Sequence, residues 1–200
     1  MKVTKEKSAE NRAVLTRTAG RMFRARGIDG VGVAEISKAA GLTHGALYAQ
    51  FPSKQALAAE ALAHGMARNL AYLTALKPDG APMLRDYLDA YLSPEHRENL
   101  ADGCAMAASA SEAARQDEAF SARFAEGLEQ MAGAIQATLE AKSPEADDRA
   151  RALTIAAAMI GGVAVARAAA KSRPDLSDEI VANVRRVLGE LGGEAAAPRN

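Results

Sequence analysis

A short polar segment around residue 44 carries side chains that could recognise the edges of DNA bases. His44 can donate to or accept from a base edge, and Tyr48 can reach a phosphate or a thymine methyl group. Gly45 removes a side chain where protein and bases would come closest. Thr43 is a good N-cap, so these residues fall at the start of a helix, and the N-terminal residues of a recognition helix enter the major groove. The segment predicts contacts with base edges.

A second polar pair, Ser53 and Lys54, stands where the next helix is expected to begin. Free amides, the helix dipole and an ammonium group together favour a phosphate at such a position. Plainer alternatives remain open for several of these residues. His44 and Lys54 could be solvated side chains, and Tyr48 could be a core aromatic, although its neighbour Leu47 points to a different face of the helix.

Four helices are expected to position these side chains. Apolar residues recur at helical spacing over residues 8–26, and Gly27 suits the end of that helix. A short helix from residue 33 stops at Gly41, a third helix follows Thr43, and Pro52 separates it from a fourth that runs toward residue 68. Two short helices joined by a tight glycine-containing turn form a helix-turn-helix. The expected apolar stripes are Leu15, Ala19, Met22 and Phe23; Val33, Ile36 and Ala40; Ala46, Leu47 and Phe51; and Leu57, Ala61, Leu62 and Gly65.

The remaining chain also has helical periodicity and contains no segment with the period of a strand. Further helices are expected at residues 84–91, 94–99, 105–115, 120–139, 145–170 and 177–191. The segment KPDGAP is a linker-like break, and GEAAAPRN at the end is expected to be a disordered tail. The sequence therefore predicts an all-α fold.

Composition and charge narrow the class of protein. Residues 1–55 hold ten Lys and Arg against four acids, a charge of +6, while the whole chain is neutral, so the rest carries −6. A basic end on an acidic body suits a nucleic-acid module joined to a part that does not bind nucleic acid, although such an asymmetry can also arise by chance. The single Cys104 excludes an intramolecular disulfide and a cysteine-based zinc cluster. We expect no metal and no cofactor.

The segment VGVAEISKAAGLTHGALYAQFPSKQALAAEAL, residues 31–62, resembles the DNA-binding signature of the TetR family of bacterial regulators. The segment HRENLADGCAMAASASE, residues 96–112, is similar to a second motif found in one branch of that family. The chain departs from the family pattern where Val31-Gly32-Val33 replaces a Ser or Thr cap, and where Gln50 stands at a position that is often His. The resemblance implies a phosphate contact for Gln50, without charge.

The resemblance also implies partners. It predicts an N-terminal three-helix helix-turn-helix domain (1–55) that binds double-stranded operator DNA, and a C-terminal helical ligand-binding and dimerisation domain (56–192) before the tail (193–200). The last two helices would form a homodimer, which the Ala- and Gly-rich helix over residues 145–170 supports independently, because it is apolar nearly all round. A small-molecule inducer would bind among the middle helices. Its candidate contacts, each of which could also be plain core, are Tyr87, Tyr91, Cys104, Met106, Ala107, Phe120, Phe124 and Met131.

Alternatives from other classes stay open. The regulator could be independent of ligand or respond to oxidation of Cys104, or the chain could be an architectural DNA binder. An enzyme is disfavoured, because the sequence has no phosphate-binding loop, and His44, His64 and His96 lack the spacing of a shared site. No signal-peptide pattern is present, so we expect a cytoplasmic protein. The uncharged stretch 152–166 is shorter than a membrane span, and no membrane partner is expected.

Overall fold

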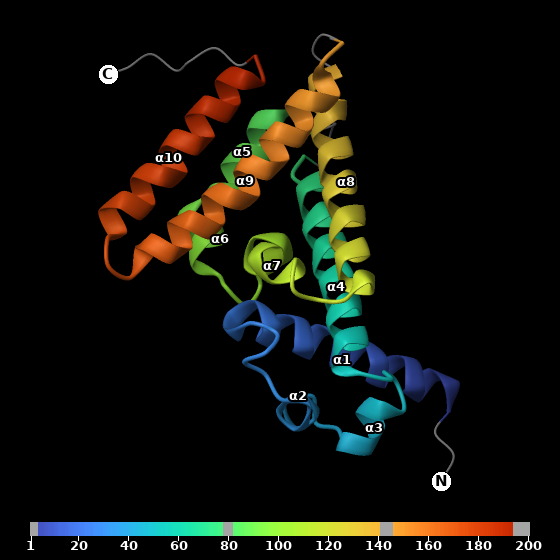
Figure 1. Cartoon of the computed structure of the whole chain (residues 1–200). Helices are drawn as coiled ribbons and strands as arrows, with labels where there is room; N and C mark the ends of the chain where they lie inside the picture. Colours follow the sequence, from blue (N-terminus) through green and yellow to red (C-terminus); the bar gives the residue numbers. More distant parts are fainter. Residues whose placement is uncertain (1–3, 78–81, 141–145, 194–200) are drawn as a thin grey trace. The chain divides into compact units, whose positions relative to one another are not determined.

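The computed structural model describes residues 4–77, 82–140 and 146–193, and within these ranges it contains ten helices and no strand (Figure 1). The predicted tail from residue 194 on and most of KPDGAP lie outside the described residues. The chain divides into two compact units. The N-terminal unit comprises residues 1–67 and 100–125, and the C-terminal unit comprises residues 68–99 and 126–200. The all-α prediction is confirmed.

The N-terminal unit contains α1 (Lys5–Arg26), α2 (Val33–Ala39), α3 (His44–Tyr48), α7 (Ala105–Ala113), most of α4 (Lys54–Thr74) and the start of α8 (Glu118–Glu140). Thr4 caps α1 by accepting a hydrogen bond from the Lys7 amide at 3.2 Å. Gly27 ends the helix with φ of 78°, a conformation that favours glycine. The core of the unit is fully buried and centres on Leu15, Ile36, Leu47, Phe51 and Leu57.

Helix α3 is shorter than its sequence pattern predicted. It ends at Tyr48, and Phe51 lies in the turn that leads to α4 rather than in the helix. Phe51 is nevertheless only 1% exposed, because the turn folds its ring back into the core. Apolar spacing identified the buried positions correctly and placed the helix end wrongly, since periodicity does not distinguish a last helical turn from a compact loop.

The C-terminal unit contains α5 (Leu84–Tyr91), α6 (Pro94–Glu98), the rest of α8, α9 (Asp148–Ala170) and α10 (Pro174–Leu191). Helices α9 and α10 lie side by side (Figure 1). A methyl group added at Gly162 of α9 would come within 3.1 Å of the Val184 side chain of α10. Gly162 therefore permits the close approach of the two helices.

Buried polar groups join α6 to the α9–α10 pair. Arg97, itself 9% exposed, donates to Ser177 Oγ at 3.1 Å and forms an ion pair with Asp178. Ser177 in turn donates to the Ala166 carbonyl at 2.8 Å. Arg167 donates to the carbonyls of Arg97 (2.8 Å) and His96 (3.0 Å). These bonds satisfy backbone carbonyls at the end of α6 that the short helix leaves without internal partners.

Helix α9 is longer than the uncharged stretch 152–166, which by itself is shorter than a membrane span. Its 23 residues are long and apolar enough to span a membrane by length and composition alone, with a mean hydropathy of 1.8 over an 18-residue window. Core helices of soluble proteins share this property.

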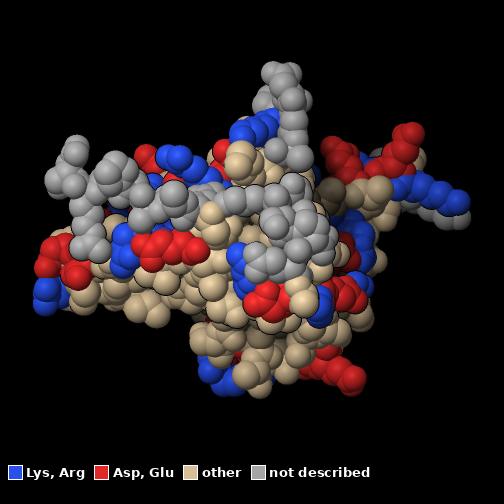
Figure 2. Space-filling view, turned by 90° about the horizontal axis from the view of Figure 1, so that it is seen from above, with Lys and Arg blue, Asp and Glu red and all other residues tan. Residues whose placement is uncertain are grey.

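Figure 2 shows one face of the molecule, on which acidic and basic side chains alternate with uncharged ones and no broad area carries a single sign.

Candidate DNA-reading site

Helix α3 presents three of the predicted base-contacting residues to solvent. Leu47 is fully buried beneath the helix, which leaves His44, Gly45 and Tyr48 exposed, the tyrosine by 47%. The rings of His44 and Tyr48 meet edge to face with their centroids 4.9 Å apart. A methyl group added at Gly45 would find nothing within 4 Å, and its backbone φ is not positive. The fold itself does not require glycine at this position.

The other predicted contacts have roles within the chain. Thr43 Oγ1 accepts a hydrogen bond from the Ala46 amide at 3.2 Å, and Ser53 Oγ accepts one from the Ala56 amide at 3.0 Å, so both residues are N-caps as expected. The Gln50 side-chain amide donates to Ser8 Oγ at 2.9 Å. Gln50 thus holds α1 to the end of α3, and a contact with phosphate would have to compete with this bond.

Arg12 of α1 organises the turn between α3 and α4, a role that the sequence did not reveal. Its guanidinium donates to the Gln50 carbonyl at 2.5 Å, forms a two-point ion pair with Glu60 of α4, and lies 4.2 Å from the centre of the Phe51 ring. Thr16 Oγ1 lies 3.3 Å from the same Glu60 carboxylate. Nothing in the spacing of residues 12 and 60 predicts that they meet.

Much of the N-terminal positive charge is engaged inside the chain. Five of the ten basic residues counted in residues 1–55 bind acids or carbonyls, namely Lys7 with Glu10, Arg12 with Glu60, Arg21 with Asp102, Arg24 with the Ala101 carbonyl, and Arg26 with Glu35. Across the part of the chain that the structure describes, four have no ion-pair partner: Lys5, Arg17, Lys38 and Lys54. The charge count alone overestimated the cations that are free to bind phosphate.

Comparison with known proteins agrees with this geometry. The family model described as bacterial regulatory proteins, tetR family, matches residues 15–61, which include α2 and α3. Residues 15–61 are thus similar to the DNA-binding domain of the TetR family. No curated protein matches the sequence of this chain significantly.

Solved structures of TetR-family proteins share the fold. Escherichia coli NemR in its reduced form superposes with a TM-score of 0.74 at 20% identity, covering 95% of this chain and all of that one. A TetR regulator from Chloroflexus aurantiacus gives 0.72 at 23% identity, with 94% and 95% covered. A TetR-family regulator from Cytophaga hutchinsonii gives 0.71 at 20% identity, with both chains fully covered. At these identities the likeness establishes the fold.

The predicted inducer contacts are divided between the two units of the chain. Cys104, Met106, Ala107, Phe120 and Phe124 belong to the N-terminal unit, and the remaining three candidates belong to the C-terminal unit. Tyr87, Tyr91, Cys104, Met106, Ala107, Phe120 and Met131 are buried, and Phe124 is half-buried. Cys104 caps α7, its sulfur 3.4 Å from the Ala107 amide nitrogen.

The second segment singled out in the sequence, residues 96–112, contributes contacts at both of its ends. At its start, His96 stacks on Tyr91 with ring centroids 4.7 Å apart. Burial, with the positive charges of Arg167 and Arg68, lowers the pKa of His96 to about 4. At its end, the Glu112 carboxylate accepts a hydrogen bond from the Ile28 amide, with N–O distances of 3.2 and 3.4 Å. Glu112 therefore holds α7 against the turn that follows α1.

Proposed function

We propose that this chain is a DNA-binding regulator of the TetR type, a cytoplasmic repressor that reads its operator as a homodimer and leaves it when a small apolar molecule binds. The observation that carries the DNA-reading part is the solvent face of α3. His44 and Tyr48 project from a short helix anchored by Leu47, and Gly45 between them leaves a gap that the fold does not need. Because no neighbouring residue occupies the space beside Gly45, the backbone there can approach base edges closely.

The phosphate contacts would come from lysines that have no ion-pair partner among the described residues. Lys54 stands in the first turn of α4, beside a capped helix start, and Lys38 is exposed in the last turn of α2. Each Lys or Arg that neutralises a phosphate releases counterions, so binding should weaken as salt rises. Gln50 is a weaker candidate, because its amide already binds Ser8.

The proposed dimer face lies on α9 and α10. Gly161 of α9 is exposed, and a methyl group added there would find nothing within 4 Å, so it faces away from α10. Val165 is 57% exposed and Val187 of α10 is 47% exposed. Exposed valines beside a glycine on long helices suit burial against a second copy of the same pair. Val184, in contrast, packs on Gly162 within the chain.

The proposed response to ligand depends on the spacing of two DNA-reading helices. A dimer that reads two half-sites holds its recognition helices about 34–36 Å apart, one turn of DNA. Helix α4 starts in the N-terminal unit beside α3 and continues as one helix into the C-terminal unit. A ligand that prefers a wider spacing would need about 2.7 kcal/mol of coupling to lower DNA affinity a hundredfold, and DNA must weaken ligand binding equally.

The test begins with DNA that flanks the protein's own coding region, with binding followed by fluorescence anisotropy against random DNA of equal length. The His44→Ala change should weaken binding to the specific fragment by about 1–3 kcal/mol and leave random DNA nearly unchanged. Lys54→Ala should weaken both, with Gln55→Ala, an exposed neighbour on the same helix, as the matched control. Equal losses on both DNAs for His44→Ala would contradict its role in base choice.

The ligand part is tested by titrating candidate molecules into the protein with and without operator. Equal affinity in the two titrations, for a molecule that demonstrably binds, would rule out the coupling. A regulator that ignores ligand, or one that responds to oxidation of Cys104, would then be the better account. An architectural protein would bind specific and random DNA alike.

A further inference from the structure

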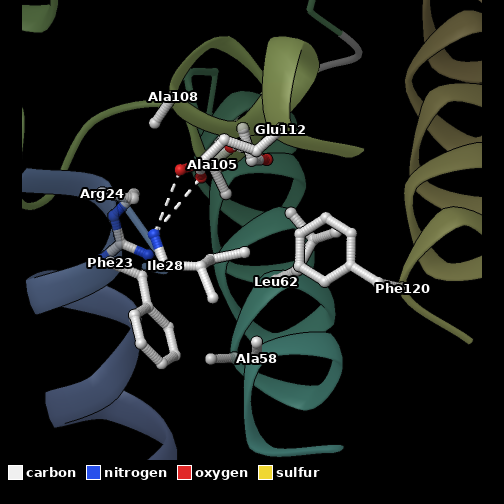
Figure 3. Close-up of a pocket in the computed structure, with 12 residues that line it drawn as sticks. Phe23, Arg24, Ile28, Ala58, Leu62, Ala105, Ala108, Glu112 and Phe120 are labelled. Atoms are coloured by element: carbon white, nitrogen blue, oxygen red, sulfur yellow. Dashed lines mark hydrogen bonds between the residues drawn. The ribbon is translucent and has the colours of Figure 1, made fainter. Parts of the chain in front are cut away.

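A hollow in the N-terminal unit lies among α1, α4, α7 and the start of α8 (Figure 3). Its space comes from residues with little or no side chain, and its walls from larger apolar groups. The small residues are Gly20, Ala58, Ala61, Ala105 and Ala108. The unfilled volume is about 300 Å³ including the part open to solvent, but the enclosed part has room for about one water molecule. Of the residues predicted for the inducer, Phe120 alone lines it.

The polar groups of the hollow are already engaged with other parts of the chain. Arg24 Nε donates to the Ala101 carbonyl at 2.6 Å, Ser109 Oγ donates to the Ala105 carbonyl at 2.7 Å, and Glu112 accepts from the Ile28 amide. The dashed lines in Figure 3 mark this last contact at the edge of the hollow. Nine of the twelve lining residues are apolar, so a charged ligand would lose its hydration against mostly apolar walls, and the chemistry of the walls selects an uncharged apolar molecule.

The size of the hollow determines what binding must do. A molecule as large as one aromatic ring does not fit into room for a single water, so a wall must move when it enters. Helix α7 contributes Ala105, Ala108 and Glu112 to the wall. The Glu112 carboxylate accepts a hydrogen bond from the Ile28 amide, in the turn between α1 and α2. Ile28 is the second residue after α1 and is 3% exposed. Displacing α7 would therefore break the Glu112–Ile28 bond and loosen the entry to the helix-turn-helix.

We propose that this hollow is a regulatory small-molecule site within the DNA-reading unit itself, which takes an uncharged single-ring molecule and opens the Glu112–Ile28 contact. The effect on DNA rests on the proposed function, whereas the binding does not. The site is distinct from the tyrosines and methionines predicted for the inducer. It places the effector beside the turn that leads to α2, and it shares only Phe120 with the residues predicted for the inducer.

Binding is tested with 4-fluorotoluene as the probe, followed by fluorine NMR of the whole protein without DNA. 4-Fluorobenzoate and 4-fluorobenzylamine, of similar size but charged, should bind at least tenfold more weakly. Ala108→Met fills the hollow with a flexible side chain, and should weaken 4-fluorotoluene at least tenfold. Ala110→Met, at an exposed position of the same helix outside the hollow, should not. No binding to the wild type, or equal binding to both variants, would overturn the proposal.

A second measurement uses the unmodified protein, so it does not depend on the folding of a variant. Saturating 4-fluorotoluene should speed hydrogen exchange of the Ile28 amide at least fivefold and leave the Leu57 amide of α4, which donates to the Ser53 carbonyl, unchanged. Unchanged exchange at Ile28 would refute the opening of the contact.

A DNA-binding measurement distinguishes the proposed function from the proposal that the hollow is regulatory. If the wild type binds its flanking DNA and 4-fluorotoluene fails to weaken that binding, the hollow is not regulatory. If the wild type does not bind that DNA at all, the proposed function fails, while the fluorine and exchange results still decide whether the hollow is a ligand site.

Discussion

Replacing Arg12 by methionine should loosen the turn that follows α3. Methionine keeps much of the apolar stem of arginine and removes the guanidinium that joins Gln50, Phe51 and Glu60. Arg17→Met is the matched control, because Arg17 is an exposed residue of the same helix and has no ion-pair partner among the described residues. Both changes remove one positive charge, so a difference in stability between them reports the internal contacts of Arg12.

The expected loss follows from three interactions. The Arg12 and Glu60 side chains are 42% and 36% exposed, so the ion pair contributes about 0.2–1 kcal/mol, as exposed pairs do. The guanidinium over the Phe51 ring adds roughly 0.5–1 kcal/mol, and the bond to the Gln50 carbonyl about 0.5–1.5 kcal/mol. The free energy of unfolding should fall by roughly 1–3 kcal/mol, a shift of about 2–4 °C in Tm per kcal/mol for a chain of this size.

Urea denaturation followed by circular dichroism measures the loss of stability. DNA binding at several salt concentrations measures the effect on affinity and on its salt dependence. Arg12→Met should weaken DNA binding without changing the slope of log affinity against log salt, because Arg12 is engaged inside the chain. A phosphate-binding Arg17 would instead lower that slope by about one unit with little change in stability. The reasoning fails if Arg12→Met is as stable as Arg17→Met, or if its salt slope falls.

Three further predictions concern charge, assembly and pH. Lys38→Ala should reduce the salt slope of DNA binding by about one unit, measured by anisotropy, and an unchanged slope would exclude a phosphate contact. Gly161→Asp should give helical monomers that lose operator binding, and sedimentation showing a monomeric wild type at micromolar concentration would contradict the dimer. Because the pKa of His96 is lowered to about 4, the unfolded chain binds its proton first, and the free energy of unfolding should fall by up to ~3 kcal/mol as pH drops from about 6.5 to 4. His96→Gln should flatten that part of the urea-midpoint profile, and an unaltered profile would assign the loss to other groups.

Sequence periodicity predicted most of the helices because the core of each unit is built from apolar stripes. Leu15, Ile36, Leu47 and Leu57 were assigned to the interior from spacing alone, and each is fully buried. The end of α3 was predicted wrongly, because the burial of Phe51 depends on a turn rather than on a helical face. Long-range partners determine such positions, and spacing does not reveal them.

The exposure of the predicted DNA contacts was predictable for a different reason. The exposure of His44, Gly45 and Tyr48 follows from the burial of Leu47 on a short helix, which is a local property. The Glu112–Ile28 contact was not predictable, since 84 residues separate its partners. The grouping of residues 100–125 with the N-terminal helices was likewise not predictable from spacing along the chain. The predicted boundaries stay a prediction.

The rate at which the single cysteine reacts measures how often the start of α7 opens in the native chain. Cys104 is 2% exposed, its sulfur caps α7, and the sequence has no second thiol and no tryptophan. A disulfide reagent can reach this sulfur only when the first turn of α7 opens, so the rate of modification counts those openings one molecule at a time. Mass spectrometry of unlabelled protein can thus rank conditions by how often the first turn of α7 opens, without a mutation or an optical probe.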